Sequence, residues 1–179
     1  MKEIIVFYIG EDEYGVGIAG MQSLENFAGI TPFPDAPECI LGTVKIRNDI
    51  YPVYDLKAKL SMPATEPTEE TKVLLLRTRV GNLACVVDRV DKVLRAEGED
   101  IQQFPDVAKT DATRYIDFIV RKDHELIVVI DPDKLLTEEE AEEIRKIDFS
   151  EDEEEENEKE NGEEENSEEE ESGKEEMRG

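Results

Sequence analysis

The sequence predicts an all-β protein of two small barrels, with short helices, a C-terminal helix and an acidic tail. Short runs rich in β-branched and aromatic residues alternate with turn residues at intervals of about 8 to 12 positions. The runs fall into two halves of roughly 60 to 70 residues, and closure into barrels removes the edges that short strands cannot protect. Because a domain of about 60 residues buries little core by itself, we expect an apolar, obligatory contact between the halves.

The first half opens with a predicted hairpin. Residues 3–9 and 14–18 form its strands around a polar turn, and alternation places Ile5, Phe7 and Ile9 on one face. We therefore expect this face to meet a core.

Apolar residues then recur at a spacing of three. Met21, Leu24 and Phe27 follow this spacing between two glycines, which predicts one or two helical turns rather than a full helix. A short extended piece at 30–33 and a loop with two prolines lead into the next hairpin.

Residues 40–56 contain the hairpin around which the first half is organised. Two β-branched-rich runs are joined by Arg47, Asn48 and Asp49, and we expect Asn48 to take a positive φ in the turn. Gly42 interrupts the first run, which predicts a bulge or the close approach of another backbone.

Pro52 and Asp55 shape the return strand and its end. Proline cannot donate to a ladder, so Pro52 predicts an edge strand or a bulge. Asp55 is expected to cap a short helix, 56–60, which Pro63 stops. The polar, proline-bearing segment 61–71 is the best candidate for a boundary between the barrels or for a mobile loop.

The second half repeats this plan. Its predicted strands are 72–77, 83–87, 90–96, 115–121 and 125–130. Arg47 and Asp49 have counterparts in Arg121 and Asp123, and Asp55 has one in Asp131. The correspondence favours an internal duplication, although unrelated segments also share the arrangement of a hairpin followed by a capped helix.

A last helix is predicted from a capping box. Thr137 and Glu140 have the spacing at which each side chain bonds the other residue's amide, and Ala141, Ile144 and Ile147 form one apolar stripe. We expect this helix to dock on a domain that spans residues 1–149.

The remaining residues, 150–179, are predicted to be a disordered tail that is dispensable for folding. They hold seventeen carboxylates and almost no apolar residue. The net charge of the chain is −26, and residues 148–179 contribute 18 acidic and 3 basic residues to it. Such a field repels nucleic acid and anionic lipid, so we expect neither as a partner. The tail is expected to tune the salt dependence of partner binding.

The compartment is predicted to be the cytoplasm. Cys39 and Cys85 lie far apart in apolar contexts, which favours free, buried thiols in a reducing environment. The first residues enter a strand pattern without the features of a signal peptide, and no run reaches the roughly 20 apolar residues that span a bilayer.

Reactive groups are sparse, so no enzyme, metal or cofactor is expected. The single histidine, His124, lies at a predicted hairpin tip, and one histidine with two distant cysteines does not form a typical zinc site. The pair Gly15 and Gly17 lacks the third glycine and the helix of a dinucleotide fingerprint. These absences favour a binding module.

One ordered pattern leads into and through the hairpin at 40–56. It consists of Pro34 and Pro37, then Gly42, then Ile46 and Arg47, then the run 50–56. This order of prolines, glycine, an apolar-Arg turn and an apolar-Pro-apolar-apolar-Asp-Leu run resembles the signature of the CheW-like coupling proteins of bacterial and archaeal chemotaxis. Residues 14–16 and 86–94 also resemble the family, so the likeness covers roughly residues 3–136.

Three positions depart from the family pattern. Asn48 and Asp117 stand where glycines are usual, and Ser23 replaces a glutamate. Asparagine tolerates positive φ at modest cost, whereas Asp117 is strained if its backbone is left-handed.

The resemblance implies a fold of two SH3-like five-stranded barrels and a non-catalytic adaptor function. Its implied partners are the regulatory domain of the histidine kinase CheA and the cytoplasmic tip of methyl-accepting chemotaxis receptors, in arrays at the inner face of the membrane. The implied partner-binding residues are Arg47, Asn48, Gly42, Met21 and Leu24. Alternatives are a CheW-like scaffold of another receptor-kinase pathway and a ligand-binding β-barrel enzyme.

Overall fold

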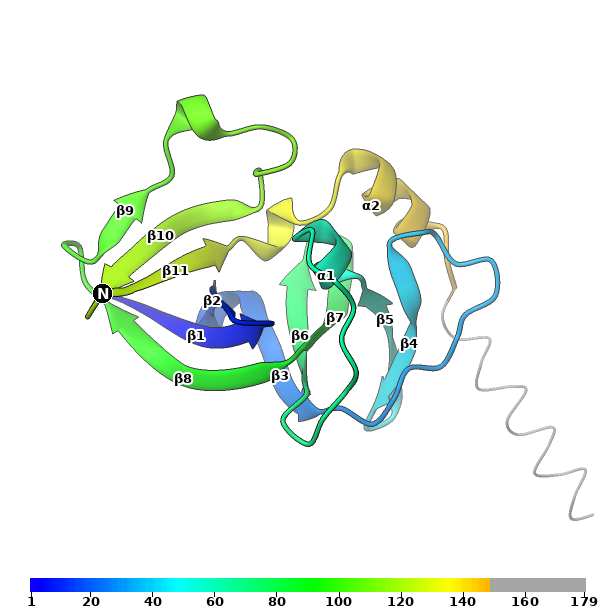
Figure 1. The fold of residues 1–179 in the computed structure, drawn as a ribbon. Helices are drawn as coiled ribbons and strands as arrows, with labels where there is room; N and C mark the ends of the chain where they lie inside the picture. The colour runs from blue at the N-terminus through cyan, green and yellow to red at the C-terminus, as the bar shows by residue number, and fades with distance from the viewer. Residues whose placement is uncertain (149–179) are drawn as a thin grey trace, which may run out of the picture. The chain divides into compact units, whose positions relative to one another are not determined.

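The computed structural model describes residues 1–148, which form two β-sheets that pack on a common core (Figure 1). The first sheet, called the first barrel below, has the strand order β8-β1-β2-β11-β10-β9. Its strands are β1 (Lys2–Ile9), β2 (Asp12–Gly17), β8 (Arg89–Ala96), β9 (Ile101–Gln103), β10 (Ile116–Lys122) and β11 (Glu125–Ile130).

The second sheet, called the second barrel, has the order β3-β6-β7-β5-β4. Its strands are β3 (Met21–Asn26), β4 (Ile40–Ile46), β5 (Asp49–Tyr54), β6 (Lys72–Thr78) and β7 (Gly81–Val87). The helical segments are η1 (Ile18–Gly20), α1 (Leu56–Lys59), η2 (Asp106–Ala108), η3 (Pro132–Lys134) and α2 (Glu138–Arg145).

The two barrels interleave along the chain. The first barrel combines the N-terminal hairpin β1–β2 with β8 to β11, while the second holds β3 to β7. The chain therefore passes between barrels at η1 and again at Asp88, the one residue between β7 and β8. Segment 61–71 connects α1 to β6 within the second barrel, and a domain boundary there stays a prediction.

Strand β1 separates two cores. Ile5, Phe7 and Ile9 pack between the barrels, as their alternation predicts, while Ile4 and Val6 pack inside the first barrel. The core between the barrels, called the shared core below, is the largest apolar cluster and includes residues of both sheets and of the helices that cover them. The two barrels therefore share an apolar contact, as expected, although each barrel combines strands from both halves of the sequence.

The predicted helical turns at Met21, Leu24 and Phe27 are wrong, because residues 21–26 form β3 and pair with β6. The register shifts between Met21 and Ser23. A bulge inserts one extra residue, so the apolar spacing along the strand becomes three. In sequence this spacing is the same as that of a short helix.

The β4–β5 hairpin differs from expectation at two positions. Arg47, and not Asn48, has the positive φ, at 59°. Pro52 does not lie on an edge strand, because β5 pairs with β4 on one side and with β7 on the other. Proline is tolerated because β5 meets β7 at a single residue pair, Val53 with Ala84, and the bulge lies in β4 instead.

The predicted caps are confirmed. Asp55 accepts a hydrogen bond from the Ala58 amide at the start of α1. Thr137 and Glu140 form the reciprocal capping box of α2, whose Ala141 and Ile144 are buried in the shared core. The predicted tail, 150–179, lies outside the described residues.

Candidate partner-binding surfaces

Arg47 occupies an exposed and strained position. It is the first of two loop residues between β4 and β5, with Ile46 paired to Asp49, and its φ is 59°. Glycine is favoured at such a position, and a left-handed non-glycine residue costs on the order of 1–3 kcal/mol. Within residues 1–148 its guanidinium has neither a hydrogen-bond partner nor an ion-pair partner. Among the described residues, the tip therefore presents an unpaired cation to solvent.

Asn48 is exposed beside Arg47 without strain of its own. Its φ is not positive, and neither is that of Asp117. The two departures from the family glycines therefore cost no backbone strain.

Gly42 lies where the backbone after β3 approaches β4 and closes the second barrel. Thr31 and Thr43 exchange backbone hydrogen bonds of 2.9 and 2.8 Å, which join the segment after β3 to β4. The φ of Gly42 is +152°, and a Cβ there would lie 2.2 Å from the Thr31 carbonyl oxygen. The predicted bulge and close approach are both confirmed, and they give Gly42 a structural role.

The predicted site residues divide between the two edges of one sheet. Gly42, Arg47 and Asn48 belong to β4 and its turn, whereas Met21 and Leu24 belong to β3 at the opposite end of the strand order. A hollow of about 300 Å³ connects the edges near the Arg47 tip, and residues of β3, of segment 28–31 and of β4 line it.

Leu24 belongs to a set of exposed apolar residues at the margin of the shared core. It is 41% exposed and pairs with Leu74, a shared-core residue. Val93 is 54% exposed and pairs with Ile5, which is also in that core. Together with Ile18, the first residue of η1, which is 40% exposed, Leu24 and Val93 are called the apolar rim. Residues of the rim come from both barrels.

Sequence reasoning did not select Ile18 or Val93 as site residues. The available signal was an apolar side chain on the polar face of an alternating strand, as Val93 is between Asp91 and Arg95. Met21, by contrast, is half-buried against the shared core and contributes to packing.

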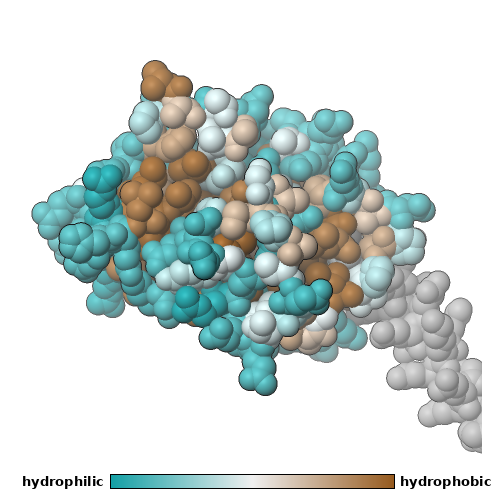
Figure 2. All heavy atoms as spheres, in the orientation of Figure 1, coloured by the Kyte–Doolittle hydropathy of each residue, from teal (hydrophilic) through white to brown (hydrophobic). Residues whose placement is uncertain are grey.

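The loop between β9 and β10 carries a second unpredicted feature. Val107, in η2, is 97% exposed. In Figure 2 the projection over η2 is hydrophobic at its tip, and a further hydrophobic area lies below it.

A cavity of about 640 Å³ lies beside α1 and α2 and has acidic walls. Cys39 and Tyr54 contribute to its lining. Burial raises the pKa of the Cys39 thiol to about 11, so the nucleophilic thiolate is scarce at neutral pH. Burial likewise raises the pKa of Tyr54, whose hydroxyl donates to the Glu140 carboxylate at 3.3 Å.

The described residues offer no assembled reactive centre. Among residues 1–148 no three His, Cys, Asp or Glu side chains are placed to hold a metal ion. His124 lies in the β10–β11 turn with a φ of 69° and is exposed. Cys39 and Cys85 are both free thiols. No helix in the described part is long and apolar enough to cross a membrane.

The chain thus has two barrels on a shared apolar core, an exposed cation at one tip, and an apolar rim with residues from both barrels. These features define a protein-binding module. Residues 3–140 match the CheW-like domain, and the chain belongs to the CheW-like family. It is a chemotaxis coupling adaptor built from two SH3-like barrels.

The chain is similar to chemotaxis proteins over most of its own length and most of theirs. The chain is 30% identical to the chemotaxis protein CheW of Klebsiella aerogenes, covering 78% of this chain and 84% of that protein. It is 28% identical to CheW of Rhizobium meliloti, covering 79% and 91%. The crystal structure of the scaffolding protein CheW of Thermoanaerobacter tengcongensis superposes with a TM-score of 0.69 at 26% identity, covering 78% and 94%.

Proposed function

We propose that the chain couples the cytoplasmic tip of methyl-accepting chemotaxis receptors to the regulatory domain of the histidine kinase CheA, without catalysing a reaction itself. It works at the inner face of the membrane, in receptor arrays. Family membership supports this proposal, and so does the presence of two surfaces of different chemistry on the described domain.

The observation that carries the proposal is the condition of Arg47. An exposed arginine in a left-handed turn, without an ion pair to residues 1–148, adds strain and contributes no internal contact. Backbone strain of this kind clusters at sites of function, and four other non-glycine residues of the described chain also have a positive φ, so the strain supports the proposal only together with the exposed charge. Arginine binds carboxylates in a planar, bidentate manner, so the β4–β5 tip is assigned to an acidic surface of the kinase domain.

The apolar rim is assigned to the receptor. Leu24 and Val93 are exposed, pair with residues of the shared core and come from different barrels, and Ile18 is exposed in η1, where the chain passes between the barrels. An amphipathic helix can lay its apolar face along such a margin, with anchors at helical spacing. The receptor's helical hairpin then contacts both barrels, while the kinase contacts the tip of the second.

A binding assay with the isolated kinase regulatory domain tests the first assignment. Arg47→Ala should weaken binding at least about tenfold, a loss typical of a charged hydrogen-bonded contact. Arg114→Ala is the matched control, because it removes the same charge from an exposed site in the first barrel. Equal affinities of the two variants would refute the assignment of the tip.

A receptor cytoplasmic fragment tests the second assignment. Leu24→Gln should reduce receptor binding, while Leu126→Gln, at a 52% exposed leucine near the β10–β11 tip, should not. Equal losses for both variants would show that general surface polarity, and not the rim, determines binding.

A further inference from the structure

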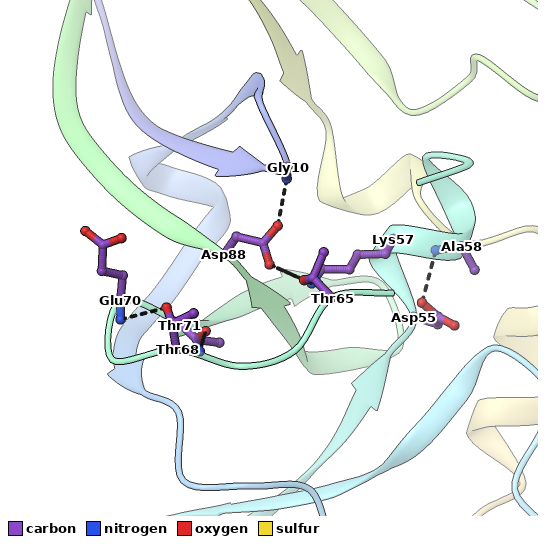
Figure 3. Close-up of polar contacts among 9 residues, drawn as sticks. All are labelled: Gly10, Asp55, Lys57, Ala58, Thr65, Thr68, Glu70, Thr71 and Asp88. Carbon is purple, nitrogen blue, oxygen red and sulfur yellow. Dashed lines mark hydrogen bonds and ion pairs between the residues drawn. The ribbon is translucent and has the colours of Figure 1, made fainter. Parts of the chain in front are cut away.

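A single carboxylate connects the two barrels at the point where the chain crosses between them (Figure 3). Asp88 lies between β7 of the second barrel and β8 of the first. One of its oxygens accepts from the Gly10 amide, in the β1–β2 turn of the first barrel, at 2.7 Å. The other accepts from Lys57 Nζ, in α1 of the second barrel, at 2.7 Å. The groups that Asp88 joins thus belong to different barrels.

Segment 61–71 closes over the same point. The Thr65 hydroxyl donates to Asp88 at 2.6 Å and also contacts Lys57. Met62 lies against Gly10, because a Cβ on that glycine would be 3.3 Å from the Met62 methyl. The segment predicted as a boundary or mobile loop is therefore tied to the junction of the barrels.

The charged side chains at this point are largely buried, and the backbone of Asp88 is hydrogen-bonded to β1. The Lys57 and Asp88 side chains are only 14% and 23% exposed. The Asp88 amide donates to the Tyr8 carbonyl at 3.0 Å, which holds the crossover against β1. Charge-assisted hydrogen bonds of this length are directional. Apolar contact in the shared core stabilises association but is itself non-directional, so the charged hydrogen bonds at the crossover add an orientational constraint to that packing.

We propose that the Asp88 junction, meaning Asp88 with Gly10, Lys57 and Thr65, sets the angle between the two barrels and thereby shapes the apolar rim. Asp88 is a positioning residue, because it contacts no part of the rim itself. The consequence for partners rests on the proposed function: receptor binding, which uses both barrels, depends on the junction. Kinase binding at the Arg47 tip, which uses one barrel, does not.

Residual dipolar couplings of backbone amides in a weakly aligned sample measure this angle directly. In the wild-type chain one alignment tensor should fit both barrels. In Asp88→Asn the two barrels should require tensors of different orientation. A single shared tensor, oriented as in the wild type, would overturn the proposal.

Asp100→Asn is the matched control. The Asp100 carboxylate also accepts from a backbone amide, that of Glu97 at 2.9 Å, and from Lys122 Nζ at 3.3 Å. All of these groups belong to the first barrel. Asp100→Asn should therefore leave one tensor for both barrels, and a split tensor in this control would overturn the specific role of Asp88.

Two further measurements keep the test decisive. Exchange of the Gly10 amide should accelerate at least about tenfold in Asp88→Asn, because its charged acceptor is lost. If that variant does not fold, Lys57→Met replaces it, since the bonds from Gly10 and Thr65 to the carboxylate remain. An unchanged inter-barrel angle in Lys57→Met would then count against the proposal.

Partner affinities separate this inference from the proposed function. Asp88→Asn should weaken binding of the receptor fragment about tenfold and change binding of the kinase domain by less than about twofold. Equal effects on both partners would overturn the selective role of the junction. If the wild-type chain binds neither partner, the proposed function fails, while the dipolar couplings still decide whether Asp88 sets the angle.

Discussion

Arg47 keeps a long cationic side chain at a backbone position that favours glycine. Arg47→Gly should leave the free energy of unfolding unchanged or raise it by up to about 1 kcal/mol, because relief of a left-handed residue outweighs the added chain entropy. The same variant should lose kinase binding. Urea denaturation and a binding titration on one preparation check both parts. A clear loss of stability would show that the arginine is structural.

Gly42, in contrast to Arg47, is expected to contribute to the stability of the fold. Gly42→Ala places a Cβ 2.2 Å from the Thr31 carbonyl oxygen in a φ that side chains rarely adopt. We expect it to lower the free energy of unfolding by about 2–4 kcal/mol, through overpacking and backbone strain. Gly98→Ala, with no atom within 4 Å of the added carbon, is the control. Thermal unfolding of the two variants measures the difference.

At the scale of elements, α2 depends on its first turn to cover the shared core. Thr137 accepts from the Glu140 amide at 3.1 Å, and Glu140 accepts from the Thr137 amide at 2.9 Å. Thr137→Ala should cost about 1 kcal/mol and accelerate amide exchange in the first turn of α2. Glu142→Ala, on the exposed side of the same helix, should not. Equal exchange in the two variants would contradict the role of the cap.

Elements with a local cause were predictable, and those with a distant cause were not. The capped turns at Asp55 and Thr137 depend on residues within one helical turn, and both were predicted. The β3 strand depends on a bulge and on its pairing with β6, about 50 residues away, so its apolar spacing alone indicated a helix. The positive φ of Arg47 rather than Asn48 is an exception, because the hairpin register that pairs Ile46 with Asp49 is local and was still not predicted.

At the scale of the molecule, Asp88 should give stability a measurable pH dependence. Burial acts to raise the pKa of Asp88, but hydrogen bonds from Gly10, Lys57 and Thr65 outweigh it and hold the pKa below its usual value. The stability it contributes is therefore present above the unfolded-state pKa, about 3.9, and is lost as pH falls through the lower folded-state pKa. Arg89, Glu66 and Glu70 lie beside the junction.

Comparison with Asp88→Asn isolates this contribution. The difference in the free energy of unfolding between wild type and variant should be constant at neutral pH and shrink as pH falls below about 4. Chemical denaturation at a series of pH values measures it. A difference that is independent of pH would mean that the charge of Asp88 adds no stability.

The division of surfaces between barrels could be predicted only in part. The family signature selected Arg47, Gly42 and Leu24, which the fold places on one sheet, although Leu24 was expected in a helical turn. The apolar rim was not predicted as a unit, because Ile18, Leu24 and Val93 belong to different elements, whose arrangement depends on the interleaving of the chain between barrels. Asp88 bonds to residues as far as 78 positions away in the sequence, and no local pattern indicates such a junction.

The most direct test of the adaptor function is a reconstitution of kinase activity from receptor fragment, CheA and this chain. The wild-type chain should raise kinase activity above that of receptor and kinase alone. Arg47→Ala should abolish the increase, while Arg114→Ala should retain it, with the unfolding free energies of all three equal within about 0.5 kcal/mol. Full kinase activation by the Arg47→Ala chain would contradict the account.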